Sequence, residues 1–219
     1  MLTVWFIRHA QSESNAGLLT AADARIALTP HGHAQAACIP AAFSERPTLI
    51  VTSPYLRARQ TAQPAIEMFP DVPVEEWPIH EFSILSLDHR HNTTPAERLP
   101  LVKAYWERGD PLYNDGAGAE SFADLLGRVH AALERIRRFE EGFLAVFGHG
   151  LFTRALLWSL LAAPQAIDAT CMRRCNSFIT AVKMPNAAIL PMRFGPSGEV
   201  WFSPFVTSHL PPQLVTENW

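Results

Sequence analysis

The sequence is poor in cysteine and has no excess of positive charge. Its three cysteines, Cys38, Cys171 and Cys175, are odd in number and lack the spacing of a zinc site or of a disulfide framework. They indicate reduced thiols in a cytoplasmic protein. Lysine and arginine number 18 against 21 aspartates and glutamates, a net charge of −3 that favours neither nucleic acid nor a membrane surface as a partner.

The sequence also lacks a long apolar run. Its longest such stretch, residues 155–163, is far shorter than the roughly 20 residues that a membrane-spanning helix needs. Arg8 interrupts the first apolar run too early for a secretory signal. We therefore expect a cytoplasmic protein with no membrane association. Its 219 residues, 48% of them hydrophobic, are enough to form one domain over residues 1–219.

Strand and helix patterns alternate along the chain. This alternation predicts an α/β fold, a three-layer sandwich with a mostly parallel central sheet and helices on both faces. Between residues 78 and 120 the pattern weakens around several prolines and one predicted helix, so 78–120 is predicted to be a cap inserted into the domain. Strands are predicted at 4–7, 49–52, 73–77, 143–147, 177–184, 188–194 and 200–205, and helices at 30–42, 55–68, 96–108, 121–140 and 151–161.

Two of the predicted strands lead directly into a histidine. The first is followed by Arg8-His9, and a later one by Gly148-His149-Gly150. Ligands of open α/β sheets bind outside the carboxyl ends of the strands, so these side chains should share one pocket. A neutral imidazole is a nucleophile, and a guanidinium holds phosphate oxygens in a planar fork. The pattern therefore predicts a site that moves a phosphoryl group.

The chemistry of phosphoryl transfer suggests a role for each of these residues. His9 is the predicted nucleophile, and its second ring nitrogen should be held by an acceptor such as a backbone carbonyl. Charge that develops on the phosphoryl oxygens calls for fixed donors, which Arg8, Arg57 and His149 would supply without a metal. Gly150 would let the backbone beside His149 approach the phosphate closely.

These residues belong to a longer series of ordered motifs that covers most of the first 150 residues. The motifs are Arg8-His9-Ala10 followed by Asn15, Leu28-Thr29-Pro30-His31-Gly32 with Gln35, Ser53-Pro54-Tyr55-Leu56-Arg57-Ala58-Arg59-Gln60-Thr61-Ala62, and Gly148-His149-Gly150. Together they resemble the histidine phosphatase superfamily, the phosphoglycerate-mutase-like clan. The chain departs from the usual pattern at Ala10 and Gln11, where the family commonly has glycine and glutamate.

The resemblance implies a phosphohistidine mechanism. His9 would take the phosphoryl group while a carboxylic acid protonates the leaving oxygen, and the same carboxyl group would then activate water. By resemblance this acid is Glu81, with Glu120 as the second choice because it matches the family's Gly-Glu-Ser segment. Asn15 matches a phosphate ligand of the family. The resemblance implies no cofactor.

Several histidines have a spacing that is familiar from metal sites. His31 and His33 form one His-x-His pair, and His89 and His91 form another. No aspartate, glutamate or cysteine stands at a matching spacing, and a phosphohistidine site needs no metal. We therefore expect no metal site.

Two other functions stay open at this point. A phosphomutase would transfer the phosphoryl group to a second substrate, but 78–120 shows no segment rich in arginine and lysine like that of the phosphoglycerate mutases. A non-catalytic phospholigand-binding protein would not need to keep both histidines and both arginines. The leading prediction is metal-independent hydrolysis of a small-molecule phosphomonoester, with the oligomeric state left open.

Overall fold

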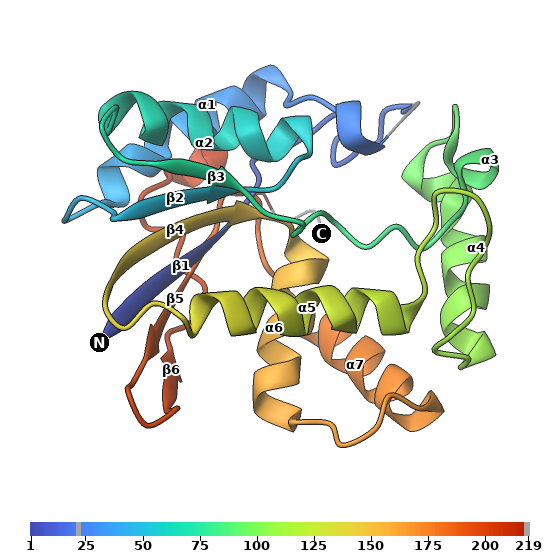
Figure 1. The fold of residues 1–219 in the computed structure, drawn as a ribbon. Coiled ribbons are helices and arrows are strands. Elements are labelled where there is room, and N and C mark those ends of the chain that lie inside the picture. Colours follow the sequence, from blue (N-terminus) through green and yellow to red (C-terminus); the bar gives the residue numbers. More distant parts are fainter. Residues whose placement is uncertain (21–22, 217–219) are drawn as a thin grey trace.

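The computed structural model describes residues 1–20 and 23–216, and across them six strands form one mixed sheet (Figure 1). The strands are β1 (Leu2–Arg8), β2 (Leu49–Thr52), β3 (Val74–Glu76), β4 (Gly142–Gly148), β5 (Ile189–Phe194) and β6 (Val200–Phe202). Their order is β3-β2-β4-β1-β5-β6, in which the first four run parallel and β5 runs antiparallel to both of its neighbours. The predicted α/β fold with a mostly parallel sheet is confirmed.

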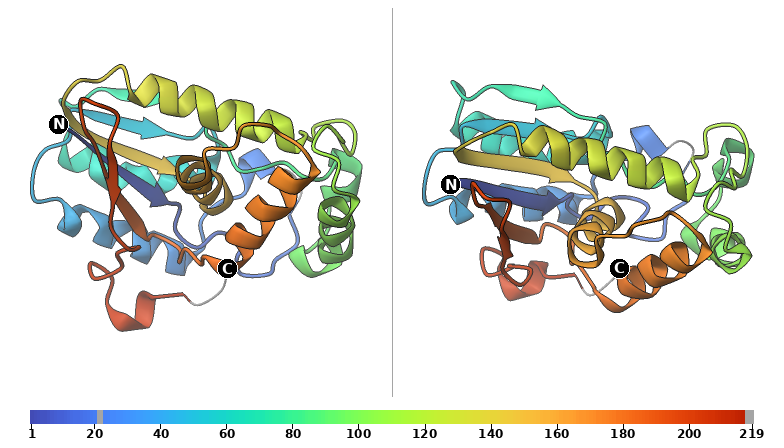
Figure 2. Two further views of the ribbon diagram at one scale, coloured as in Figure 1. Left: turned by 90° about the horizontal axis from the view of Figure 1, so that it is seen from below. Right: turned by 60° about the horizontal axis from the view of Figure 1, so that its bottom comes forward.

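Helices cover both faces of this sheet (Figure 1, Figure 2). Above it in Figure 1 lie α1 (Pro30–Cys38) and α2 (Leu56–Met68), and below it lie α5 (Phe122–Ile136) and α6 (Gly150–Ala162). The helix α7 (Ala169–Ala181) packs against α6. The predicted three-layer arrangement is therefore confirmed. Within the described ranges, no helix combines the length and the apolar character needed to cross a lipid bilayer.

Alternate side chains of the central strands face opposite helix layers. Val4 and Phe6 of β1 are buried in the cluster that contains the apolar faces of α5 and α6, whereas Ile7 is buried in the cluster that contains α1 and α2. The neighbouring strand β4 alternates in the same way, with Val146 on one side and Phe147 on the other. Burial on both faces is typical of parallel strands between helices, and it holds the ends of β1 and β4 firmly side by side.

The segment 78–120 lies beyond the end of the sheet at which the parallel strands finish (Figure 2). It contains the short helix α3 (Leu87–Arg90) and the longer helix α4 (Pro95–Arg108). A capping box begins α4, because the Thr94 hydroxyl accepts from the Glu97 N–H at 3.3 Å and Glu97 accepts from the Thr94 N–H at 2.7 Å. The remaining elements are the 3-10 turns η1 (Asp23–Arg25), η2 (Ile39–Ala42) and η3 (Pro212–Leu214).

One predicted strand is wrong. Residues 177–184 were expected to extend the sheet, but most of them belong to α7. Their β-branched and aromatic side chains favour a strand locally, whereas packing against α6 and a helix cap favour a helix. The cap is Asp168, whose carboxylate accepts from the Cys171 N–H at 2.7 Å. The buried residues of α7 follow helical spacing: Cys171, Met172, Cys175 and Ile179.

The helix predicted at 30–42 is shorter in the structure. The α-helical part ends at Cys38, and the 3-10 turn η2 follows it. Pro40 explains the change, because proline has no N–H with which to continue an α-helix.

Candidate active site

The register of β1 and β4 brings the two histidines together. Arg8 stands opposite Gly148 in the parallel pair, so His9 and His149 follow at the same edge of the sheet. The His9 N–H donates to the Gly148 carbonyl at 2.9 Å. The two imidazole rings lie 5.1 Å apart between centroids. The structure thus places both histidines where the strand-end argument predicts.

His9 has one ring nitrogen held and the other directed at an arginine. Its Nδ1 lies 2.8 Å from the Ala10 carbonyl oxygen, and its Nε2 accepts from Arg57 Nε at 3.2 Å. Both contacts are satisfied when Nδ1 carries the proton and Nε2 carries the lone pair. Burial, followed by the charges of Arg57 and Arg8, lowers the pKa of His9 well below its ordinary value. The ring is therefore neutral at pH 7, the form that a nucleophile needs.

We predict that His9 does not titrate in the usual range of histidine. A lowered pKa means that the ring stays neutral as the pH falls through 6.5, since protons bind only at lower pH. In an NMR titration of the free protein, the His9 Cε1 proton should keep its chemical shift between pH 8 and 6. A His9 midpoint near pH 6.5 would contradict the assignment of a neutral nucleophile.

Arg57 is buried although it stands in the first turn of α2. A cation there opposes the helix dipole, so local structure does not explain its position. Its Nη1 donates to the Asp23 carbonyl at 2.7 Å, and its guanidinium lies 4.9 Å from the centre of the Tyr55 ring. These contacts hold the guanidinium beside His9, where it can receive phosphate oxygens.

Arg8 lies against the start of α6. Its Nη1 donates to the Met184 carbonyl, while its buried Nε has no hydrogen-bond partner among the described residues. A Cβ atom added at Gly150 would lie only 2.9 Å from that Nε. Gly150 therefore leaves the room that the Arg8 side chain occupies, a role that the sequence does not reveal.

His149 is completely buried and is the N-cap residue of α6. Its Nε2 lies 2.7 Å from the Ser53 hydroxyl, which also accepts from the Tyr55 N–H at 3.3 Å. Its Nδ1 is buried, and no residue within 1–20 or 23–216 forms a hydrogen bond with it. Burial first, and then the charge of Arg57, lowers the pKa of His149 well below its ordinary value. The ring is therefore neutral. Ser53 fixes its orientation, and in the sequence Ser53 is marked only by the motif to which it belongs.

Glu81 lies at the N-terminus of α6, where its carboxylate accepts three backbone N–H groups. Oε1 accepts from Phe152 at 3.1 Å and from Phe82 at 3.2 Å, and Oε2 accepts from Leu151 at 3.2 Å. The positive end of a helix is a favourable place for a carboxylate. Glu81 also lines the cavity that contains His9. Of the two predicted acids, it is the one beside the histidines.

Glu120 makes an ion pair instead. Its Oε2 accepts from Arg128 Nε at 2.9 Å, and Arg128 Nη2 contacts its other oxygen. It also accepts from the Ser83 N–H at 3.3 Å, and it is not part of the cavity lining. Arg128 in turn donates to the carbonyl oxygens of Pro78 at 3.0 Å and of His80 at 2.9 Å. This pair holds the loop that carries Glu81, so the geometry favours Glu81 as the acid.

We predict that Arg128→Gln destabilises the protein by about 3 kcal/mol or more, because it leaves the largely buried Glu120 carboxylate without its counter-ion. The matched control is Arg135→Gln on the same helix. Arg135 pairs with Glu75 at 2.7 Å, but both side chains are more than 40% exposed, so the expected loss is about 1 kcal/mol or less. Urea unfolding of the three proteins measures the difference. Equal losses for the two variants would show that the Glu120 pair does not fix this loop.

Asn15 lines the cavity, and hydrogen bonds between its side chain and Ser12 close the loop in which it lies. Its Oδ1 accepts from the Ser12 N–H at 3.2 Å, from the Ser12 hydroxyl at 3.0 Å and from Asn186 Nδ2 at 3.0 Å. With the oxygen engaged, the amide N–H groups of Asn15 are the donors that a phosphate can use. The fully buried Asn186 also donates to the His9 carbonyl at 3.1 Å. In the sequence, Asn186 reads only as a turn residue.

Motif residues outside the cavity support the loop that follows His9. Gln35 Oε1 accepts from the Gln11 N–H at 2.7 Å, and Thr61 Oγ1 accepts from the Ala10 N–H at 3.0 Å. The Gln11 side chain accepts from Thr29 Oγ1 at 2.7 Å. A Cβ atom at Gly32 would collide with the Gln11 carbonyl oxygen. These motif residues therefore position backbone rather than substrate.

We predict that Gly32→Ala destabilises the protein by about 1 to 3 kcal/mol, because the backbone of α1 or of the loop must move away to accept the methyl group. Gly127→Ala is the matched control. A Cβ at Gly127, exposed on α5, meets nothing within 4 Å, so that change should stabilise by about 0.5 to 1 kcal/mol. Chemical unfolding measures both values. The two changes in the free energy of unfolding should have opposite signs. A Gly32→Ala variant as stable as the unmutated protein would contradict the close approach of Gly32 to the Gln11 carbonyl.

The cavity next to His9 has a volume of about 210 Å³. Arg8, His9, Asn15, Arg57 and Glu81 all line it. Sequence analysis missed several further lining residues: Ser12, Ser14, Asp23, Arg90 and Arg98. Within the part of the chain that the structure describes, no group of three His, Cys, Asp or Glu side chains is placed to hold a metal ion.

Two of the missed residues come from the segment 78–120. Arg90 is buried and pairs with Asp23, and Arg98 Nη1 donates to the Thr93 carbonyl at 3.0 Å. In the sequence, Arg90 and Arg98 are recognisable only by their positions near and within the helix predicted at 96–108. Those positions do not show that the helix folds back over the carboxyl ends of the strands.

Comparisons with known proteins give a family for the sequence and solved structures with a similar fold. The family model of the histidine phosphatase superfamily (branch 1) matches residues 4–185. A mutant phosphoserine phosphatase from Entamoeba histolytica, in complex with phosphoserine, has a similar structure, with a TM-score of 0.72 at 20% identity, covering 96% of this chain and 100% of that one. No curated protein sequence matches this chain.

Two other solved structures are similar at comparable identity. A mycobacterial glucosyl-3-phosphoglycerate phosphatase gives a TM-score of 0.71 at 22% identity, covering 95% of this chain and 100% of that one. A putative alpha-ribazole-5'-P phosphatase from Escherichia coli gives 0.70 at 18% identity, covering 94% and 98%. At these identities the structures support a shared fold.

The chain belongs to the histidine phosphatase superfamily, as the family model over residues 4–185 shows. This membership identifies it as a phosphatase.

Proposed function

We propose that this phosphatase hydrolyses a small-molecule phosphomonoester without a metal, through a phosphoryl group carried on His9. The observation that carries the proposal is the state of the His9 ring. Its Nδ1 is held at 2.8 Å by the Ala10 carbonyl, and its Nε2 faces Arg57 Nε at 3.2 Å. The nucleophilic lone pair is thus directed toward a phosphate-binding guanidinium before any substrate arrives.

Phosphate binding would use two donors that have no partner in the part of the chain that the structure describes. Arg8 Nε and His149 Nδ1 are both buried and unpaired, and an unsatisfied buried donor is costly unless a ligand completes it. With Ser53 donating to Nε2 of His149, the ring proton is on Nδ1 and can bind a phosphoryl oxygen. The incoming phosphate would also replace His9 as the acceptor for Arg57 Nε. Asn15 and the backbone at Gly150 complete the proposed set.

The first step forms the bond between His9 Nε2 and phosphorus and breaks the bond between phosphorus and the leaving oxygen. Glu81, in its acid form, gives a proton to that oxygen, so the alcohol leaves neutral. In the second step the Glu81 carboxylate takes a proton from water, and the resulting hydroxide attacks phosphorus. The bond to His9 then breaks, and inorganic phosphate and the original enzyme are regenerated. Residues 78–120 would act as the cap over this site.

The similar structures support the substrate class. They are described as phosphatases of phosphoserine, alpha-ribazole-5'-P and glucosyl-3-phosphoglycerate, three different small phosphomonoesters. Their variety supports phosphomonoester hydrolysis without favouring one alcohol.

Hydrolysis of 4-nitrophenyl phosphate in excess chelator tests the proposal. We expect turnover that chelation does not lower, with one phosphate released per nitrophenol. A panel containing a second alcohol tests the mutase alternative, because transfer would release less phosphate than nitrophenol. Turnover that needs an added metal ion would contradict the proposal, and so would the absence of turnover on every phosphomonoester of the panel.

A further inference from the structure

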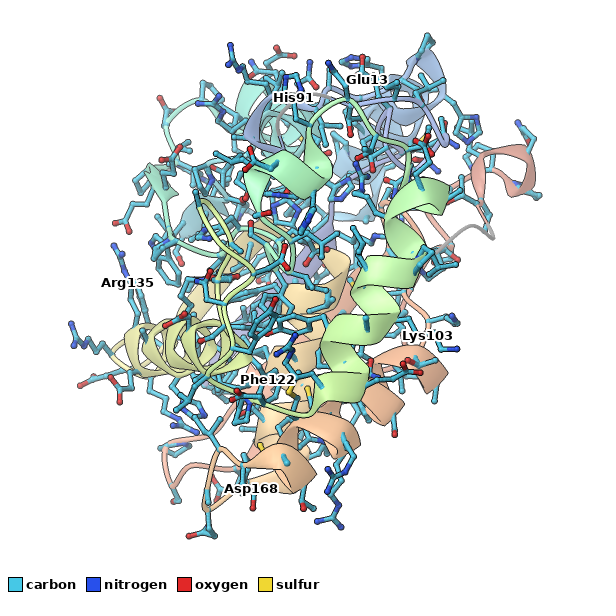
Figure 3. All side chains as sticks on the ribbon, turned by 90° about the vertical axis from the view of Figure 1, so that its right-hand side faces the viewer. Glu13, His91, Lys103, Phe122, Arg135 and Asp168 are labelled. Carbon is cyan, nitrogen blue, oxygen red and sulfur yellow. The ribbon has the colours of Figure 1, made fainter. Side chains whose placement is uncertain are left out.

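A groove with a volume of about 980 Å³ runs between α4 and α7, and it is much larger than the cavity of about 210 Å³ next to His9. The helices α4 and α7 contact one another. Figure 3 looks onto this side of the molecule and shows Lys103 on α4, near α7. Neither the family match nor the proposed mechanism gives this groove a role.

The groove adjoins the cavity that contains His9. Ile84 and Val102 line both spaces. An alcohol that extends from a phosphoryl group at His9 toward these two side chains would pass from the small cavity into the groove.

The lining of the groove indicates what such a leaving group contains. Its apolar part includes Val102 and Trp106 of α4 and Ile179 of α7. Four basic side chains also line it, among them Lys103 and Arg173, against one acidic side chain, Glu107. Lys103 lies 3.7 Å from Glu107, and both side chains are largely exposed, so this pair is weak. The groove thus combines apolar walls with an excess of positive charge.

We propose that the groove binds the alcohol part of the substrate, and that this alcohol is extended, with an apolar body and a second acidic group at its far end. The inference rests on the proposed hydrolysis at His9, since it describes the substrate of that same site. The apolar body would contact Val102, Trp106 and Ile179. The acidic group, a carboxylate or a further phosphate, would lie beside Arg173.

A series of synthetic phosphomonoesters tests chain length and charge separately. The alcohols are unbranched chains of two, six and ten carbons that end in a methyl group, a carboxylate or a phosphate. For the unmutated protein we expect kcat/KM to rise at least tenfold from the two-carbon to the ten-carbon substrate. We expect a preference of about fivefold or more for an acidic end over a methyl end at ten carbons. The carboxylate and phosphate arms tell which acid is preferred.

Two variants on α7 locate the effect, each with a control on the same helix. Asn176→Trp fills the groove, and Arg173→Glu reverses one of its charges. Arg174 is not part of the groove lining, so Arg174→Trp and Arg174→Glu are the controls. We expect Asn176→Trp to remove the dependence on chain length and Arg173→Glu to remove the preference for an acidic end. The controls should keep both, and thermal unfolding checks that every variant is folded.

The outcomes separate this inference from the proposed function. Turnover of the two-carbon substrate with no gain for longer chains would overturn the groove as a substrate site while leaving hydrolysis at His9 intact. A gain that Asn176→Trp and Arg174→Trp reduce equally would also overturn it. The absence of turnover on all substrates would contradict the proposed function itself, and the inference would fail with it.

Discussion

His9→Ala is expected to lower kcat for 4-nitrophenyl phosphate by on the order of 10⁴-fold or more, because covalent catalysis has no substitute when its nucleophile is removed. In the proposed mechanism the ring supplies the attacking nitrogen, and the neighbouring guanidinium of Arg57, whose Nε contacts His9 Nε2, binds and polarises the phosphate. Steady-state release of nitrophenol in the presence of chelator measures the effect.

His33→Ala is the matched control for this loss. His33 is exposed on α1, so its removal should leave kcat unchanged within about twofold. Because His9 is buried and hydrogen-bonded, thermal unfolding of His9→Ala must show a cooperative transition before the loss is assigned to chemistry. A folded His9→Ala protein with more than a tenth of the normal kcat would contradict its role as nucleophile.

Glu81→Gln is expected to lower kcat for alkyl phosphates by about 10² to 10⁴-fold, the usual contribution of a general acid and base. The effect on formation of the phosphoenzyme should be much smaller for 4-nitrophenyl phosphate, because nitrophenolate leaves without a proton. The amide keeps the shape of the side chain, but only its oxygen can accept, so one of the two positions that now accept a backbone N–H at the start of α6 is lost. Thermal unfolding checks that the variant is folded. Rapid-quench kinetics with both substrates separates the first step from the second.

Glu120→Gln distinguishes the two carboxylates. Glu120 is held in its ion pair with Arg128 and lies outside the cavity lining, so its substitution should lower stability without a dependence on the leaving group. If Glu120→Gln showed the larger loss on alkyl phosphates and Glu81→Gln showed none, the two roles would have to be exchanged.

The residues that the sequence predicts well are those whose position follows from local rules. His9 and His149 each follow a buried strand, and neighbouring parallel strands finish at the same edge of the sheet. The start of the helix predicted at 121–140 is equally local, because the Ser121 hydroxyl accepts from the Asp124 N–H at 3.1 Å and caps α5. The position of Glu81 came from the resemblance to a family, since no spacing rule predicts that 78–120 returns to the start of α6.

The features that the sequence does not predict depend on contacts between distant segments. Asn186 contacts the His9 carbonyl across 177 positions of the chain, and no pattern around a Pro-Asn turn indicates this. The last five residues of α7 lie in a segment, 177–184, that was predicted as a strand because its side chains favour strands locally, while burial of the helix's apolar stripe against α6 decides the outcome. Arg90 lies at the cavity because it pairs with Asp23, an ion pair that joins two segments 67 residues apart.

The groove between α4 and α7 illustrates the same limit. Its lining includes Ile84 and residues from 99–107, 151–154 and 173–183, and part of the last range was predicted as a strand. The two proposals together assign the reacting phosphate to the strand ends and the alcohol to the groove between α4 and α7. Local sequence patterns predict the site at the strand ends, whereas the groove between α4 and α7 depends on tertiary packing.

The most direct test of the account is a rapid-quench experiment that traps the phosphoryl group on the protein. The protein is mixed with excess 4-nitrophenyl phosphate in chelator, quenched in alkali, digested and analysed by mass spectrometry, with His9→Ala treated in parallel. The account predicts one added phosphoryl group on the peptide that contains His9, formed as fast as the first turnover and absent from His9→Ala. Full turnover with no phosphoryl group on that peptide, or with the group on another residue, would contradict it.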